Sequence, residues 1–121
     1  TDTTLTAAIT PSATSSKVLV LATHNGNYVS DDDGNNALTI KLFRTTTEIG
    51  RTGGVNWTSS AVENIISSAS FNVLDSPSST SAITYKTQFF NINGTASCAV
   101  QKSHGGDWST TSYITLIEIG V

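Results

Sequence analysis

The chain of 121 residues is poor in charge: charged residues make up 12% of it, hydrophobic residues 37%, and the formal net charge is −3. Because its polarity comes mainly from Ser, Thr and Asn, the composition disfavours a helical bundle and favours strands joined by polar turns. The six Lys and Arg residues are scattered singly, which argues against a nucleic-acid-binding surface. No apolar run is long enough to predict a transmembrane helix. We expect one domain over residues 1–121.

The first half of the chain predicts strands separated by polar turns. Leu5–Thr10 is typical of a short edge strand and is stopped by Pro11. Lys17–Thr23 is apolar at successive positions, which predicts a central strand, and Asn25-Gly26 after it is a turn signal. Ala37–Arg44 alternates between apolar and polar side chains, as a half-buried strand does. Another strand is expected to begin within residues 45–50.

The second half continues the pattern. Extended segments are expected at 70–74 and 83–92, and 95–102 is expected to return as the hairpin partner of 83–92, because Asn93-Gly94 lies between them. Residues 61–66 fit either a helical turn or a strand. Together with the final segment this gives about eight antiparallel strands at regular spacing. That spacing predicts an all-β fold, a β-sandwich of the jelly-roll type.

The last strand-like segment, Tyr113–Ile119, has apolar side chains on both of the faces that a strand presents alternately. Such a pattern predicts a strand that is central in a sheet and buried on both faces. In a chain of this size the second burying surface is expected to be another subunit. An ordinary two-layer core with one unusually apolar central strand is the alternative.

Several stretches carry a resemblance that covers nearly the whole chain. They are Ala8-Ile-Thr-Pro-Ser12, Ser16-Lys-Val-Leu-Val20, Leu42-Phe-Arg-Thr-Thr-Thr-Glu-Ile-Gly50, Leu74-Asp-Ser-Pro-Ser-Ser-Thr-Ser-Ala-Ile-Thr-Tyr-Lys-Thr-Gln88 and Ile114-Thr-Leu-Ile-Glu-Ile-Gly120. The chain resembles the β-domains that end fibre, spike and decoration proteins in the virions of tailed bacteriophages, notably marine and cyanobacterial ones. These motifs are strand and turn signatures and contain no catalytic constellation.

The resemblance implies a jelly roll of the tumour-necrosis-factor and complement C1q type, assembled as a homotrimer in the virion. The domain would be the C-terminal part of a longer protein, an expectation that also fits a chain starting at Thr1 without Met. A three-fold axis would hide the second apolar face of its strands. The residues expected to line that axis are Val18, Val20, Tyr113, Thr115, Ile117 and Ile119.

Aromatic and imidazole side chains in the predicted loops are the candidate ligand-binding residues. They are Trp57, Trp108, His24, His104 and Tyr28, and the segments expected to carry recognition are 25–36, 53–59 and 103–108. Exposed aromatic rings on loops stack on the apolar faces of sugars and supply binding hot spots. The alternative is that the two indole rings fold back and cap the ends of the sandwich.

No pattern in the sequence predicts an active site, a metal site or a cofactor site. There is no Gly-x-Ser-x-Gly elbow and no phosphate-binding loop. Glu118 is expected to be a buried structural partner of Lys41 or Arg44, and Cys98 a small buried apolar residue. The segment Asp31–Asp33 fails the EF-hand pattern and fits a solvated acidic turn, with an irregular cation-binding loop as the alternative.

These observations leave three non-enzymatic functions. The first is a trimeric fibre or spike domain that attaches the virion to a glycan or protein of the host surface. The second is a decoration protein that clamps the coat subunits of the phage head. The third is a secreted carbohydrate-binding module. Other virion proteins are expected partners in the first two cases, whereas nucleic acid and membranes are not.

Overall fold

The computed structural model describes residues 1–30, 37–55, 65–92, 97–102 and 110–120. Eight strands lie within them: β1 (Asp2–Ile9), β2 (Lys17–Ser30), β3 (Leu38–Arg44), β4 (Thr47–Val55), β5 (Ile65–Asp75), β6 (Ile83–Asn91), β7 (Ser97–Ala99) and β8 (Tyr113–Ile119). They form two antiparallel sheets. The prediction of an all-β sandwich of about eight antiparallel strands is therefore confirmed.

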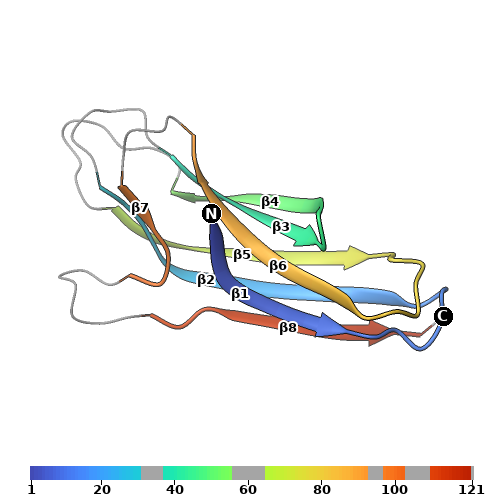
Figure 1. The fold of residues 1–121 in the computed structure, drawn as a ribbon. Coiled ribbons are helices and arrows are strands. Elements are labelled where there is room, and N and C mark those ends of the chain that lie inside the picture. Colours follow the sequence, from blue (N-terminus) through green and yellow to red (C-terminus); the bar gives the residue numbers. More distant parts are fainter. Residues whose placement is uncertain (31–36, 56–64, 93–96, 103–109, 121) are drawn as a thin grey trace.

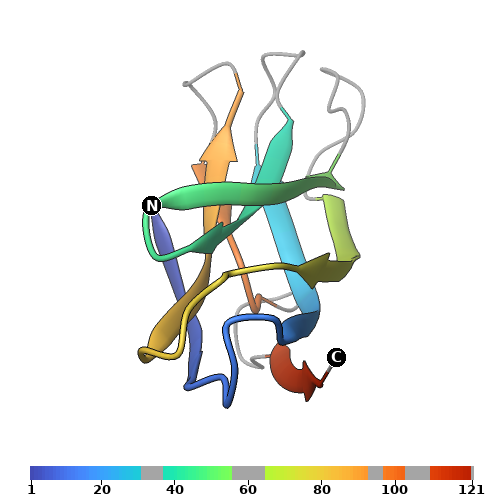
Figure 2. The ribbon, with the colours of Figure 1, turned by 90° about the vertical axis from the view of Figure 1, so that its right-hand side faces the viewer.

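The two sheets have different strand orders. The first runs β1-β6-β3-β4, and the second has β2 at its centre, with β5 on one side and both β7 and β8 on the other. The sheets stack face to face, so that β1 lies over β8 and β4 over β5 (Figure 1, Figure 2). The free edges of β1 and β8 therefore lie along the same side of the sandwich.

Alternating side chains from both sheets fill the space between them. In β3 every second residue from Leu38 is buried, as the apolar-polar alternation of its sequence predicts. The main core consists of Val18, Val20, Ala22, Ile40, Leu42, Ala69, Phe71, Ile83 and Tyr85. Each large apolar side chain that is removed from water here contributes about 1.5–3 kcal/mol.

Strand β2 is longer than its sequence predicts, because the expected turn at Asn25-Gly26 is a β-bulge. The register with β5 shifts between His24 and Asn27, and Gly26 adopts a φ of 65° inside the strand. A bulge bends its strand and increases the local twist. The bend divides one edge of β2 between two partners: residues 17–23 pair with β8 and residues 28–30 with β7.

The predicted hairpin between residues 83–92 and 95–102 is wrong. Strand β7 pairs with β2 in the opposite sheet, in the register Val29 to Cys98. The physical reason is that β6 has no free edge over most of its length, because β1 occupies one side and β3 the other. Cys98 itself is half-buried, and this burial raises the pKa of its thiol.

The prediction that Tyr113–Ile119 is central in its sheet is also wrong. Among the described strands β8 pairs with β2 alone, so it lies at an edge. Its burial alternates strictly, with Ile114, Leu116 and Glu118 half-buried and Tyr113, Thr115, Ile117 and Ile119 exposed. The second apolar face of the strand lies on the outer surface of this chain rather than in its core.

This arrangement corrects the residues expected at a trimer axis. Val18 and Val20 are 0% exposed and belong to the core between the sheets, so they are closed to another subunit. The other four residues, on β8, lie on the outer surface. Successive side chains of β2 point alternately into the core and out to the surface. Because the side chains on both faces of this strand are apolar, the sequence does not reveal which face is buried.

The ion pairs differ from those expected for Glu118. Its Oε1 accepts hydrogen bonds from the backbone N–H and the hydroxyl of Ser12, each 2.7 Å long, and the pKa of its carboxyl is lowered by them. Lys41 instead forms an ion pair with Glu48 at 3.1 Å, and Arg44 forms one with Asp75 at 2.9 Å. The prediction of a pair between Glu118 and either Lys41 or Arg44 is wrong.

Candidate ligand-binding groove

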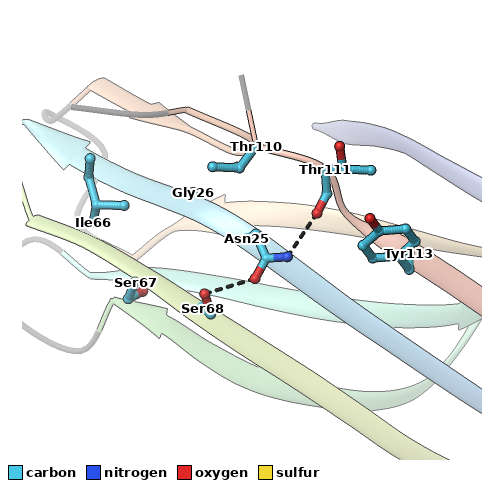
Figure 3. Close-up of a pocket in the computed structure, with 8 residues that line it drawn as sticks. All are labelled: Asn25, Gly26, Ile66, Ser67, Ser68, Thr110, Thr111 and Tyr113. Carbon is cyan, nitrogen blue, oxygen red and sulfur yellow. Dashed lines mark hydrogen bonds between the residues drawn. The ribbon is translucent and has the colours of Figure 1, made fainter. Parts of the chain in front are cut away.

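An open groove of about 700 Å³ lies where β2, β5 and the start of β8 meet (Figure 3). Its lining comes from three parts of the chain. Strand β2 contributes Asn25 and Gly26, β5 contributes Ile66, Ser67 and Ser68, and the segment that leads into β8 contributes Thr110, Thr111 and Tyr113. A volume of this size is within the range of small-molecule sites in proteins.

The bulge at Gly26 explains why these segments come together. Lys102 crosses directly over Gly26, and its N–H donates a 3.0 Å hydrogen bond to the Gly26 carbonyl. A Cβ at Gly26 would clash with the Lys102 backbone and with the Thr110 hydroxyl. Only glycine combines that close approach with a positive φ. The N–H of Thr110 in turn donates to the carbonyl of Gln101 at 3.1 Å, which places Thr110 at the groove.

Asn25 forms hydrogen bonds to the other two segments that line the groove. Its Nδ2 donates a 2.8 Å hydrogen bond to the carbonyl of Thr111, and its Oδ1 accepts a 2.9 Å bond from the Ser68 hydroxyl (Figure 3). Its backbone N–H donates to the Ser112 hydroxyl at 3.1 Å. One side chain therefore connects β2 to β5 and to the segment before β8.

Two hydroxyl groups of the lining residues have no hydrogen-bond partner within the described part of the chain. Ser67 Oγ and Thr110 Oγ1 are both buried from solvent at the atomic level and unpaired. Because both oxygens are closed to solvent, a ligand in the groove does not reach them. Ser67 lies on the inner side of β5, since it pairs with the buried Asn27 and shares its side of the strand with the buried Ala69. The surface of the groove is formed instead by exposed residues such as Ser68 and Thr111.

The remaining lining residues are apolar or aromatic. The ring of Tyr113 is 62% exposed, and Ile66 lies at the other side of Asn25 (Figure 3). The lining, as described, contains amide, hydroxyl, aliphatic and phenolic groups and no Asp, Glu, Lys, Arg or His. It is suited to bind an uncharged ligand rich in hydroxyl groups.

The structure places the predicted ligand-binding residues in different surroundings. Trp57, Trp108 and His104 lie outside the described residues. Tyr28 is half-buried on β2, with the ammonium group of Lys102 3.8 Å from the centre of its ring, and it is not in the groove lining. Asn25 belongs to the predicted segment 25–36 and does line the groove, but it does so from within a strand.

The expectation that His24 faces a ligand or solvent from a loop is wrong. Its side chain is 0% exposed and lies between the sheets, where Nε2 is 2.8 Å from the hydroxyl of Thr87. The hydroxyls of Thr87 and Thr3 are 2.6 Å apart, which extends the hydrogen bonding across β6 to β1. Burial lowers the pKa of His24 to about 4, so the ring is neutral near pH 7.

Within the described ranges, no group of three or more His, Cys, Asp and Glu side chains lies close enough to hold a metal ion. The acidic segment Asp31–Asp33, for which a cation-binding loop was the alternative, lies outside those ranges. The groove, by contrast, consists entirely of described residues.

In comparisons with known proteins, no family model and no curated protein matches the chain.

Proposed function

We propose that this chain is a non-catalytic recognition domain that binds an uncharged glycan in the groove lined by Asn25, Ser67, Thr110 and Tyr113. The observation that carries the proposal is an open groove that combines the 62% exposed ring of Tyr113 with the exposed residues Ser68 and Thr111, and that has no charged side chain among its described lining residues. Sugar hydroxyls both donate and accept hydrogen bonds, and so do the hydroxyls of Ser and Thr.

The remaining chemistry of the groove supports a sugar over other small ligands. Tyr113 offers a flat, partly apolar surface on which the C–H face of a pyranose packs, while its hydroxyl stays available to water or ligand. The absence of charged groups among the described lining residues favours neutral sugars over sialic or uronic acids. Burying an anion without a cation would cost several kcal/mol.

The sequence resemblance suggests where such a domain works. It supports an attachment domain at the end of a bacteriophage fibre or spike, which would bind glycans of the host surface. A groove that is open on one side binds each sugar weakly. Several copies on one fibre would raise the overall affinity, because each bound copy increases the effective concentration of the next.

A glycan array tests the proposal directly. The wild-type chain should retain neutral oligosaccharides, and Tyr113→Ala should lose them because the stacking surface is gone. Tyr113→Phe is the matched control: it keeps the ring and should keep most of the binding. Binding only to sialylated or uronic-acid glycans, or equal binding by Tyr113→Ala, would contradict the proposal.

A second candidate, a decoration protein of the phage head, is favoured by one observation. The outer face of the second sheet carries exposed Leu74, Ile117 and Ile119, and exposed apolar patches mark contact surfaces between proteins. Labelling intact particles with an antibody against the chain distinguishes the two candidates. Signal at the fibre tips supports attachment, and signal spread over the head supports decoration.

A further inference from the structure

Strand β8 is a free edge. Its seven residues pair with β2 through one side only, in the register Lys17 to Ile119 through Thr23 to Tyr113. On the other side the structure describes no strand beside it, so a row of backbone N–H and C=O groups faces outward. Such a row is a template for another strand, and monomeric proteins normally block it.

The two edges of the first sheet, β1 and β4, are blocked. In β1 the register shifts between Asp2 and Thr6, and Thr4 between them has a φ of 66°, so this edge is irregular. In β4 the register with β3 shifts twice, and the strand carries Glu48 and Arg51, which form an ion pair. Irregularity and charge are the usual means of protecting an edge.

The remaining edge strands are also unsuited to pairing. Strand β7 is three residues long. The outward-facing side chains of β5 include Ser68, Ser70 and Asn72. A strand that paired with β5 would therefore bury little apolar surface against it. Strand β8 is regular over its seven residues, and three of the four side chains on its exposed face, those of Tyr113, Ile117 and Ile119, are large and aromatic or apolar.

The one charge on β8 is directed back into its own chain. The carboxylate of Glu118 accepts two hydrogen bonds from Ser12, in the segment between β1 and β2. Ile117 and Ile119 on either side of it are 44% and 40% exposed. The strand therefore presents apolar side chains and free backbone groups together.

We propose that β8 pairs antiparallel with β8 of a second copy of this chain, about a two-fold axis at Leu116. A two-fold pair is closed, so each copy uses its β8 edge and no β8 edge is left for further pairing. The two four-stranded sheets would then join into one continuous sheet. This inference does not depend on the proposed function.

The sequence of β8 is complementary to itself in that register. With Leu116 at the axis, Tyr113 lies beside Ile119 of the second copy, and Thr115 lies beside Ile117 of the second copy. All four positions are exposed on the same outer face of the single chain. Aromatic–β-branched pairs and pairs of β-branched residues are favourable cross-strand neighbours. A foreign strand would have to supply the same pattern, whereas the second copy already has it.

A pair of charge substitutions on one face tests the proposal. Leu19 on β2 lies between Leu74 on β5 and Ile117 on β8, so these two exposed residues flank it symmetrically on the same face. Sedimentation equilibrium of the full chain should give twice the chain mass of 12.7 kDa at micromolar concentration. Ile117→Lys should give the single-chain mass, and the matched control Leu74→Lys should remain dimeric.

The other outcomes overturn the proposal. A wild-type chain that is monomeric at every concentration leaves the edge unpaired. A trimer would support the three-fold assembly suggested by the sequence instead. Dissociation by both substitutions would show that the sheets associate through their faces rather than through the edge.

Hydrogen exchange gives a measurement that needs no variant and is unaffected if Ile117→Lys folds poorly. The backbone amides of β8 that do not bond to β2 should exchange slowly at high protein concentration and rapidly on dilution. Amides on the free side of β5 should exchange at a rate independent of concentration. Equal behaviour of the two edges would contradict pairing through β8.

Discussion

The hydroxyl of Tyr85 donates a 2.7 Å hydrogen bond to Oδ2 of Asp75, and this bond joins the two sheets. Tyr85 lies on β6 and is 0% exposed, whereas Asp75 is at the end of β5 in the opposite sheet. Arg44 of β3 binds both oxygens of the same carboxylate, at 2.9 and 3.1 Å. Burial, and then the bond to Asp75, raise the pKa of Tyr85 well above its ordinary value.

Removing this hydroxyl should therefore destabilise the fold. Tyr85→Phe keeps the buried ring but removes the shorter of the two hydrogen bonds to Oδ2 of the buried Asp75 carboxylate, which leaves Arg44 as the donor to that oxygen. We expect a loss of about 1–3 kcal/mol in the free energy of unfolding, measured by urea denaturation. Tyr113→Phe is the control, because that hydroxyl belongs to an exposed ring and its loss should be neutral. Equal stability of the two variants would contradict the role of the bond.

Buried His24 should make the protein less stable in acid. The pKa of His24 is about 4 in the folded chain and about 6.5 in the unfolded chain, so between these values the unfolded state binds more protons. The stabilisation is fully present above pH 6.5 and is lost as the pH falls toward 4. Over that window a shift of this size corresponds to about 3 kcal/mol.

The difference between wild type and His24→Gln isolates this contribution from that of the carboxylates. Thermal unfolding of both should be followed at several pH values from 7 down to 4. The wild type should lose stability more steeply than the variant over the window between the two pKa values. Parallel pH profiles would show that the His24 ring is not buried as a neutral group.

Glycine is required at position 26 because the chain crosses there. Gly26→Ala should cost at least about 1–3 kcal/mol of stability, because it adds strain at a positive φ and a clash with the Lys102 backbone. Gly120→Ala is the matched control, since a Cβ there meets no atom within 4 Å. Circular dichroism during heating measures both. A neutral Gly26→Ala would show that the crossing is absent.

The buried hydroxyl of Ser67 should matter neither for folding nor for binding in the groove. Ser67→Ala removes an oxygen that has no partner in the described part of the free protein, so the free energy of unfolding should stay the same or rise slightly. Binding of a neutral glycan should be unchanged, because this oxygen is closed to solvent and to a ligand. Isothermal titration calorimetry and urea denaturation measure the two effects. A variant that loses stability or binding would contradict the inward placement of Ser67.

The alternation of apolar and polar side chains, together with the turn residues, was sufficient to predict the sandwich. The pattern from Leu38 to Arg44 repeats with the period of a strand, and Pro11 marks the end of β1. The position of β8 was not predictable in the same way. Apolar residues on both of its sides match a central strand as well as an edge strand with an exposed apolar face, and the choice depends on partners far away in the sequence.

The candidate groove was even less visible in the sequence. Ser67 and Thr110 belong to a chain in which Ser and Thr are everywhere, so nothing in their neighbourhood distinguishes them. Asn25-Gly26 was noticed as a turn, and a glycine inside an apolar strand pattern is also the signal of a bulge. The bulge is what brings Thr110 and the segment before β8 to the groove, through the crossing of Lys102 over Gly26.

The most direct test of glycan recognition at this groove is a nuclear magnetic resonance titration of the labelled full chain with a neutral oligosaccharide identified on the array. The amide signals of Asn25, Ser67, Thr110 and Tyr113 should shift together and saturate with one affinity. That result would place the sugar in the groove. Shifts confined to the segments around Trp57 and Trp108, or no shifts at all, would contradict the proposed site.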